Sequence, residues 1–437
     1  MVSALTLAHV VGHGSGPIPR TYALIAGATA LYASFDALRL RWQERRFDQR
    51  RVWRPLPGTL SPVVDHPLLR RTLRLLGLAS AVLTLTVLTT GYGGAELGLG
   101  MVFVLFWVGL VPASLLLGPV WRLMNPLRAV HQAVCALTRV APGEGLRRLP
   151  ARVGVWPAVI GLFCFGWLEL AAPARDSTAT VLLWLWVYGA VQLVAATVFG
   201  SRWFARGDAF EVYSSLLAAM SPLGRSADGD RRLVLRNPFN GLAGVRAEPG
   251  LSALVSVMLS LTAFDSLANT GAWRTVSEGL PQSPVRTAGL LATALTMLGL
   301  LRLSEAAARF LSRGAPWRSG LMAPSLVPVA VGYVMAHYAS VLLLEVQRFV
   351  DVFFVSGEPA AAHHGGAKAA AYAVPAAVFI ALFQVVAVVT GHVFGVIAAH
   401  DSAVGALPPG RKVLPQIPLF VVMIGLTLGG LSLLLSV

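Results

Sequence analysis

Residues 415–435 read PQIPLFVVMIGLTLGGLSLLL, and no side chain in this stretch is charged. A helix needs about 20 apolar residues to cross the hydrocarbon core of a bilayer, which is about 30 Å thick. Further runs of similar length and character lie at residues 21–40, 72–90, 99–117, 153–172, 180–200, 250–271, 287–308, 322–346 and 370–399. The sequence therefore predicts an all-α, polytopic transmembrane helical bundle of about ten spans.

The composition of the chain also favours a lipid environment. Of its 437 residues, 56% are hydrophobic and 13% are charged, whereas about 25% of the residues in a soluble domain are charged. The net charge of +15 does not indicate a nucleic-acid partner, because the basic residues lie between the apolar runs. Residues 224–244 lack the Gly-Lys-Ser or Gly-Lys-Thr sequence of a phosphate-binding loop, which argues against ATP-driven work. The expected partner is the lipid bilayer.

Basic residues alternate with the predicted spans and so indicate how the chain is oriented. About 29 of the 35 Lys and Arg residues fall on one side, and about 6 fall on the other. This bias predicts a single transmembrane domain, residues 1–437, with an exoplasmic N-terminus and C-terminus. It also predicts two basic cytoplasmic loops, 41–71 and 201–249, the second with a short amphipathic helix after Asp208 at the membrane interface.

Ionisable side chains inside predicted spans are candidates for function, because a charge within the bilayer is costly. At about 1.5 Å per residue, Glu169 lies about 24 Å from the cytoplasmic start of its span, and Asp265 and His337 lie about 22 Å from theirs. Three helices thus place a Glu, an Asp and a His at one depth. The chain before the first span supplies His9 and His13, which are close enough in sequence to fold over this layer.

Carboxylate and imidazole groups are ligands that suit zinc or a similar divalent ion. We therefore expect Asp265, Glu169 and His337 to act as catalytic groups or metal ligands, with His9 and His13 as auxiliary ligands. A metal with an open coordination position could activate water for attack on a phosphoryl or acyl centre. In the alternative interpretation each polar group pairs separately with a neighbour, as single polar groups in membrane bundles often do.

A second set of ionisable groups is predicted near the cytoplasmic side, at Asp36, Asp208, Glu211, His392, His400 and Asp401. Together with the outer layer these groups could form a proton or ion route of the kind that transporters use. The simpler interpretation is that they cap helix ends beside the many arginines.

Several strings in the chain are similar to one known family. They are HGSGPIP at 13–19, GDAFE at 207–211, RNPFNG at 236–241, the stretch from His337-Tyr338 to Arg348-Phe349, and the stretch from GHVFG at 391–395 to His400-Asp401. The chain resembles, over nearly its whole length, the bacterial integral membrane proteins known as fenitrothion hydrolases. The resemblance implies a multi-pass protein of the bacterial plasma membrane that hydrolyses an organophosphate triester and releases a nitrophenol.

Two main functions follow as hypotheses. The first is a membrane-embedded, metal-dependent hydrolase of phosphotriester-like substrates, because a small apolar triester partitions into lipid and reaches a site at membrane depth. The second is a proton-coupled secondary transporter or permease of a small solute or metal ion, which the ionisable groups at two depths favour. A third is a non-catalytic subunit that binds a partner protein in a larger membrane complex.

Overall fold

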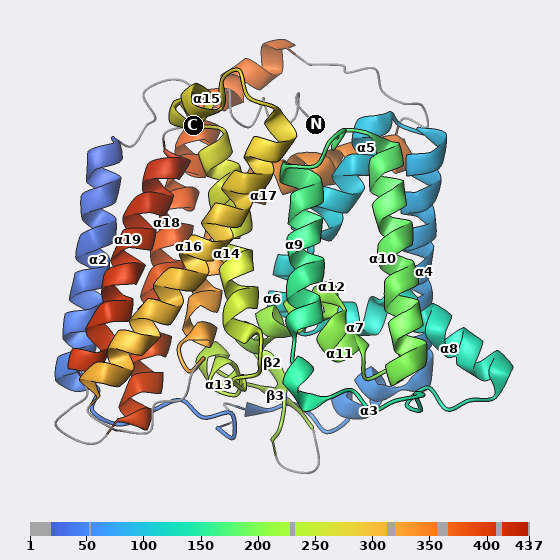
Figure 1. The fold of residues 1–437 in the computed structure, drawn as a ribbon, viewed down its shortest axis with the longest axis horizontal. Helices are drawn as coiled ribbons and strands as arrows, with labels where there is room; N and C mark the ends of the chain where they lie inside the picture. The colour runs from blue at the N-terminus through green and yellow to red at the C-terminus, as the bar shows by residue number, and fades with distance from the viewer. Residues whose placement is uncertain are drawn as a thin grey trace. The chain divides into compact units, whose positions relative to one another are not determined.

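The computed structural model describes residues 19–51, 54–227, 232–312, 320–355, 366–407 and 413–435 (Figure 1). In this part of the chain, ten helices are long and apolar enough to cross a membrane. They are Arg20–Arg41, Pro67–Thr90, Ala95–Leu117, Ala151–Leu170, Thr178–Phe199, Leu251–Ala268, Gln282–Leu311, Ala323–Val355, Val378–Ala406 and Leu414–Leu434. Each one overlaps a predicted span, so the all-α polytopic bundle is confirmed, and the chain is a multi-pass membrane protein.

The outward faces of the spans carry large apolar side chains. On α10, Thr178–Phe199, the side chains Leu183, Val187, Val191 and Val194 are each more than half exposed. These positions recur at the spacing of one helical face. A contiguous apolar stripe of this kind is unusual on a protein surrounded by water and suits contact with lipid.

Contacts within the chain divide it into two compact units. Unit 1 comprises Met1–Arg46, Glu169–Pro173 and Val255–Val437, and unit 2 comprises Phe47–Leu168 and Ala174–Leu254. The candidate site described below lies within unit 1.

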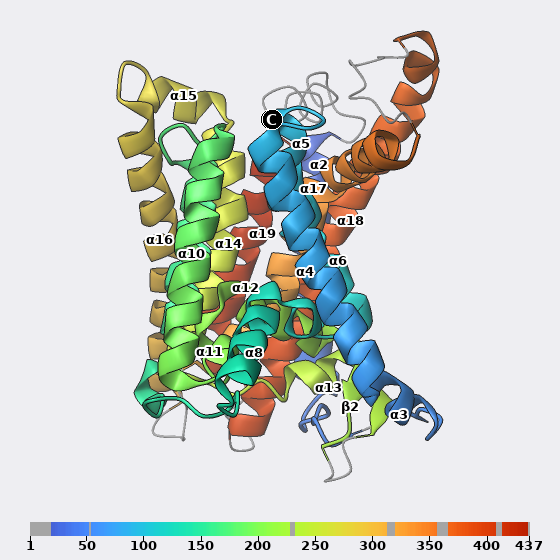
Figure 2. The ribbon, with the colours of Figure 1, turned by 90° about the vertical axis from the view of Figure 1, so that its right-hand side faces the viewer.

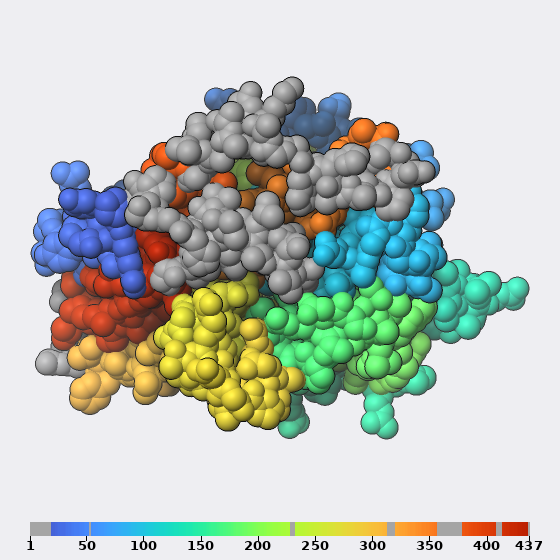
Figure 3. All heavy atoms as spheres, turned by 90° about the horizontal axis from the view of Figure 1, so that it is seen from above, coloured from blue at the N-terminus to red at the C-terminus, as the bar shows by residue number. Residues whose placement is uncertain are grey.

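Unit 1 consists mainly of long helices. These are α2 (Arg20–Arg41), α14 (Leu251–Ala268, from Val255 onward), α15 (Gly271–Ser277), α16 (Gln282–Leu311), α17 (Val327–Val350), α18 (Gly366–Ala406) and α19 (Ile417–Leu434). Short 3-10 turns, η4 (Ala323–Leu326) and η6 (Leu414–Gln416), precede α17 and α19, and the π-helical turn η5 (Asp351–Val355) follows α17. The short helix α15 lies at the surface seen in Figure 3, where it is yellow.

Helices α17 and α18 lie side by side (Figures 1 and 2) and pack through glycines. A Cβ atom added to Gly332 would lie 2.5 Å from the carbonyl oxygen of Ala387 and 3.1 Å from Cα of Gly391. The absence of side chains at these two positions therefore permits backbone contact. Next to this contact, Tyr333 packs in a buried apolar cluster with Val388 and Leu431, which fixes the face of α17 that carries the candidate site.

Unit 2 combines four of the spans with several short elements. Its helices are α3 (Leu60–Asp65), α4 (Pro67–Thr90), α5 (Ala95–Gly100), α6 (Leu110–Leu117), α7 (Val120–Met124), α8 (Pro126–Thr138), α9 (Trp156–Leu170, to Leu168), α10, α11 (Phe204–Gly207), α12 (Ala209–Leu217) and α13 (Pro238–Leu242), with the turns η1 (Met101–Phe106), η2 (Ala151–Val153) and η3 (Ala218–Met220). The π-helical turn η1 interrupts the third span, between α5 and α6.

A small antiparallel sheet joins the two predicted cytoplasmic loops. Strand β3 (Leu233–Leu235) lies between β1 (Arg54–Pro55) and β2 (Leu223–Arg225), and Leu235 is opposite both Arg54 and Leu223. Beside the sheet, Asp65 pairs with Arg225 at 2.6 Å and with Arg70. The hydrogen bond from Arg225 is the main cause that lowers the pKa of Asp65 below its usual value. The strands and the ion pair therefore hold described parts of loops 41–71 and 201–249 against each other.

The helix after Asp208 differs from the prediction of an amphipathic helix at the interface. All but one of the residues of α12 are buried, including Phe210, Glu211 and Tyr213. Because Glu211 finds an internal partner, the helix can bury its polar face as well as its apolar face. The neighbouring α8, which runs obliquely to α10 in Figure 1, does keep an exposed apolar edge at Val134 and Leu137.

Candidate functional site

Asp265 and His337 meet within unit 1. Asp265 lies in the last turn of α14, and His337 lies in the middle of α17. His337 Nε2 is 3.0 Å from Oδ2 of Asp265. The hydroxyl of Tyr338, the next residue on α17, donates a hydrogen bond of 2.6 Å to the same carboxylate oxygen. Two helices thus bring a carboxylate, an imidazole and a phenol together in one membrane layer.

The second ring nitrogen of His337, Nδ1, begins a further series of hydrogen bonds through Ser266 and Tyr333. His337 Nδ1 is 3.4 Å from the hydroxyl of Ser266, the residue after Asp265. The hydroxyl of Tyr333 donates to Ser266 Oγ at 3.0 Å and also lies 3.4 Å from the carbonyl oxygen of Gly430 on α19. Tyr333 lies one turn before His337 on α17, and the two rings stack with an interplanar angle of 9°.

The donors and acceptors along this chain are mutually consistent. If His337 carries its proton on Nε2, it donates to Asp265, and its Nδ1 accepts from Ser266, which in turn accepts from Tyr333. Every contact then has one donor and one acceptor. We call the hydrogen-bonded series Tyr338–Asp265–His337–Ser266–Tyr333 the relay.

Exposure differs along the relay. The Asp265 side chain is 14% exposed and that of His337 is 6% exposed, whereas Ser266 is completely buried. An external molecule therefore reaches Asp265 before it reaches the hydroxyl of Ser266. Burial of this kind argues against Ser266 as a nucleophile for a bulky substrate.

Glu169, the third predicted member, lies at the end of α9 in the short segment that belongs to unit 1. The side chain is 6% exposed, and it interacts electrostatically with Tyr338. The adjacent carbonyl groups of Leu170 and Ala171 accept hydrogen bonds from Arg286 and Ser283 at the start of α16. Tyr338 therefore interacts with both carboxylates. It donates a hydrogen bond to Asp265 and interacts electrostatically with Glu169.

The metal centre expected from the sequence stays a prediction, because two of its five proposed ligands lie outside the described residues. No group of three or more His, Cys, Asp or Glu side chains in the described ranges is arranged to hold a metal ion. Both ring nitrogens of His337 already face protein partners, Asp265 and Ser266. The proposed auxiliary ligands His9 and His13 lie outside the described residues. We therefore derive no chemical step through a metal.

Sequence reasoning gave no role in the site to Tyr338 or Tyr333. Tyrosine is neutral, so these residues do not stand out in an apolar span as Asp265 and His337 do. One available signal was spacing, because Tyr333 and His337 are four residues apart and so share a helical face.

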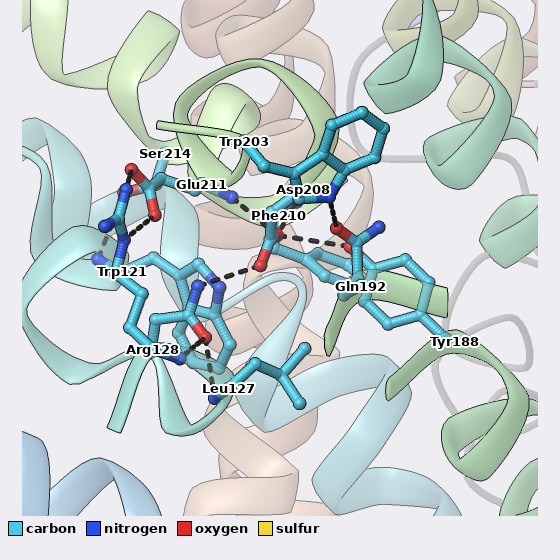
Figure 4. A network of polar contacts seen from close by, with 11 residues as sticks. Trp121, Leu127, Arg128, Tyr188, Gln192, Trp203, Asp208, Phe210, Glu211 and Ser214 are labelled. Carbon is cyan, nitrogen blue, oxygen red and sulfur yellow. Dashed lines mark hydrogen bonds and ion pairs between the residues drawn. The ribbon is translucent and has the colours of Figure 1, made fainter. Parts of the chain in front are cut away.

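Two members of the predicted inner set, Asp208 and Glu211, belong to a buried polar network of unit 2 (Figure 4). Asp208 caps α12 by accepting hydrogen bonds from the backbone N–H groups of Phe210 and Glu211, and its carboxylate also accepts from Asn125 and Tyr188. Glu211 forms a two-point ion pair with Arg128, with distances of 2.6 and 2.7 Å. These contacts support the interpretation of helix capping.

Burial acts strongly on Asp208, which is 1% exposed. Removal from water raises the pKa of its carboxyl to about 6, with a smaller contribution from the negative charge of Glu211. Among the other inner residues, Asp36 forms a partly exposed pair with Arg39 on the same helix. The imidazole of His392 is 1% exposed, and its Nδ1 contacts the carbonyl oxygen of Val388 at 2.8 Å.

No family model, curated protein or solved structure matches the chain.

Proposed function

We propose that unit 1 carries protons within the membrane, as part of a proton-coupled secondary transporter of the plasma membrane. The observation that supports this proposal is the relay, an unbroken series of hydrogen bonds through Asp265, His337 and Ser266. Carboxylate and imidazole side chains that face a bundle interior are the groups from which membrane proteins build proton routes.

The relay can pass a proton without moving its heavy atoms far. When the Asp265–His337 pair binds a proton from water, His337 carries it on Nδ1 and donates to Ser266, so that the carboxylate and the imidazolium form an ion pair. The hydroxyl groups then rotate: Ser266 donates to Tyr333, and Tyr333 donates to the Gly430 carbonyl. Release of the proton to water reverses these rotations. Asp265, the more exposed member of the central pair, is the group through which protons enter or leave.

Proton flux into sealed vesicles tests this proposal directly. The full-length protein is reconstituted in liposomes that contain a pH-sensitive dye, and a potassium diffusion potential drives protons across the membrane. We expect wild-type flux to exceed that of empty liposomes and to fall at least about tenfold in Asp265→Asn, because the amide cannot exchange the proton. Asp36→Asn is the matched control, since it neutralises a partly exposed carboxylate of the same unit.

Two results would remove the proposal. One is wild-type flux no greater than that of empty liposomes, and the other is equal flux in Asp265→Asn and wild type. His337→Gln provides an independent check because it breaks the relay at its centre and leaves both carboxylates in place.

Hydrolysis of a phosphotriester is the second candidate function. The observation that favours it is the partial exposure of Asp265, whose carboxylate is held by His337 and Tyr338. A carboxylate in this position can take a proton from a water molecule that attacks phosphorus. Release of nitrophenol from an aromatic phosphotriester, measured in detergent without a sealed membrane, separates this function from transport. Equal rates in wild type, Asp265→Asn and Tyr338→Phe would exclude it.

A further inference from the structure

A small cavity lies within unit 1, toward the ends of the spans where α17 begins. It has a volume of about 20 Å³, which is enough for one ordered water molecule. Apolar side chains such as Phe35 and Met423 form much of its wall. Four buried polar side chains, each at most 6% exposed, interrupt this apolar wall, and they are Ser304, Glu305, His400 and Gln416.

Glu305 brings a carboxylate from α16 to this cavity. Its Oε1 atom accepts a hydrogen bond of 2.9 Å from the backbone N–H of Gly320. Its Oε2 atom has no hydrogen bond of ordinary geometry from the described part of the chain and lies 3.6 Å from Nη1 of Arg302, although the backbone N–H of Met322 also acts on this carboxylate. Arg302 is 44% exposed, so it offsets only part of the cost of burying the charge. A carboxylate oxygen with unused acceptor capacity can bind a proton or a water molecule.

His400 brings an imidazole from α18, and both of its nitrogens face oxygen atoms. Nδ1 is 2.8 Å from Oε1 of Gln416, and Nε2 is 3.0 Å from the carbonyl oxygen of Trp42. A neutral imidazole has one N–H and can satisfy only one of these acceptors. The arrangement therefore requires either a second proton on the ring or a turned Gln416 amide that presents its NH₂ group to Nδ1.

Charged groups on the neighbouring elements also act on this pair. Asp401, next to His400, is 2% exposed, and Arg45 after α2 lies 3.9 Å from it. Arg302 and Arg309 on α16 act on Glu305. The described part of α19 contributes apolar side chains such as Leu419 to the wall. Glu305 and His400 therefore line one cavity whose other lining side chains are uncharged.

We propose that Glu305 and His400, which line the same cavity, form a second proton-binding site, in which one water molecule in the cavity donates to the Glu305 carboxylate. A proton from hydronium binds to a ring nitrogen of His400 and forms one N–H bond, and the Glu305 carboxylate balances the new positive charge. When the proton leaves, the Gln416 amide turns and donates to the free nitrogen. This inference rests on the proposed function, for which it supplies the inner end of the proton route.

Infrared difference spectra of the reconstituted full-length protein, recorded between low and high pH, test this site without measuring transport. We expect His400→Gln to lose an imidazolium signal. We expect Glu305→Gln to lose a carboxyl signal and to weaken the imidazolium signal at neutral pH about twofold or more, because the balancing charge is absent. Ser304→Ala is the matched control, since Ser304 lines the same cavity but donates its hydroxyl to the carbonyl of Leu301.

The outcomes separate this inference from the proposed function. The amide of Glu305→Gln retains an oxygen that can accept the hydrogen bond from the backbone N–H of Gly320. This variant should therefore fold, and it tests the site even if His400→Gln does not fold. Spectra of Glu305→Gln that match wild type would overturn the site, whatever the proton flux. Loss of the expected signals in both variants, together with no wild-type flux, would support the proton-binding site and remove the transport proposal.

Discussion

The indole of Trp42 donates a hydrogen bond of 3.2 Å to Asp401, which is 359 residues away in the sequence. The same carboxylate accepts a hydrogen bond of 2.6 Å from the backbone N–H of Arg46, and the guanidinium group of Arg46 lies over the Trp42 ring. His400, next to Asp401, contacts the carbonyl oxygen of Trp42. The end of α18 therefore holds the chain where it leaves α2.

This contact predicts a large loss of stability in Asp401→Ala. Removing the carboxylate leaves the Trp42 N–H and the Arg46 N–H without their acceptor, and each such loss costs about 1–3 kcal/mol when the group is buried. Thermal unfolding in detergent, followed by tryptophan fluorescence, measures the effect. Asp36→Ala, which breaks a partly exposed pair, should cost at most about 1 kcal/mol. Equal effects of the two substitutions would contradict the assigned role of Asp401.

In unit 2, the buried pair of Arg128 and Glu211 predicts a strong asymmetry between single and double substitutions. Glu211→Leu leaves the Arg128 charge, 12% exposed, without its partner and should cost about 3–5 kcal/mol. Replacing both residues, as in Arg128→Met with Glu211→Leu, should restore much of the loss because no unpaired charge remains. Chemical unfolding of Glu211→Leu, of Arg128→Met and of the double variant gives the coupling energy between the two side chains. If the losses in unfolding free energy of the two single variants add up to the loss in the double variant, the ion pair does not stabilise the protein.

Asp208 predicts a dependence of stability on pH. Its pKa is about 6 in the folded protein, compared with an ordinary value of 3.8 for an aspartate carboxyl, so the folded state binds the proton more tightly than the unfolded state. The contribution of Asp208 to the free energy of unfolding is fully present below about pH 4 and is lost as the pH rises through about 6. The total change is about 3 kcal/mol.

Asp208→Asn should remove this dependence, because the amide retains an oxygen to cap α12 and does not ionise. Free energies of unfolding measured at intervals from pH 4 to pH 7.5 check the difference between the two proteins. A wild-type curve that is parallel to that of Asp208→Asn throughout this range would show that Asp208 does not titrate there.

The contact between α17 and α18 predicts opposite tolerances for two glycines of unit 1. Gly332→Ala places a Cβ atom 2.5 Å from the carbonyl oxygen of Ala387, so the helices must separate at a cost of about 1–3 kcal/mol. Gly425→Ala on α19 meets no atom within 4 Å and should be neutral or slightly stabilising. Melting temperatures of the two variants in one detergent decide the comparison.

Much of the fold was predictable from the sequence because the bilayer imposes one simple requirement on length and polarity. Residues 415–435, for example, contain no charge, and the structure places Leu414–Leu434 there as a candidate span. The sheet was not predictable, since β1 to β3 are two or three residues long and carry no periodic pattern. The burial of α12 depends on Arg128, which lies 83 residues from Glu211 and forms no local pattern with it.

The candidate site was partly predictable for the same reason. Equal depth in two spans indicated that Asp265 and His337 could meet, because rise per residue translates sequence position into height. Depth gives no information on the direction in which a side chain points around its helix. The hydrogen bonds that Tyr338 and Tyr333 make depend on that rotation and required the structure.

Tyr333 has one phenolic hydrogen and two oxygen atoms that can receive it, Ser266 Oγ at 3.0 Å and the Gly430 carbonyl at 3.4 Å. It can satisfy only one of them well at a time. When Tyr333 donates to Ser266, its hydrogen bond to the Gly430 carbonyl on α19 is broken. When Ser266 donates its own hydroxyl to Tyr333, the hydrogen bond from Tyr333 to Gly430 can form. If Asp265 and His337 bind a proton as proposed, a change in their protonation therefore alters a hydrogen bond between α17 and the backbone of α19.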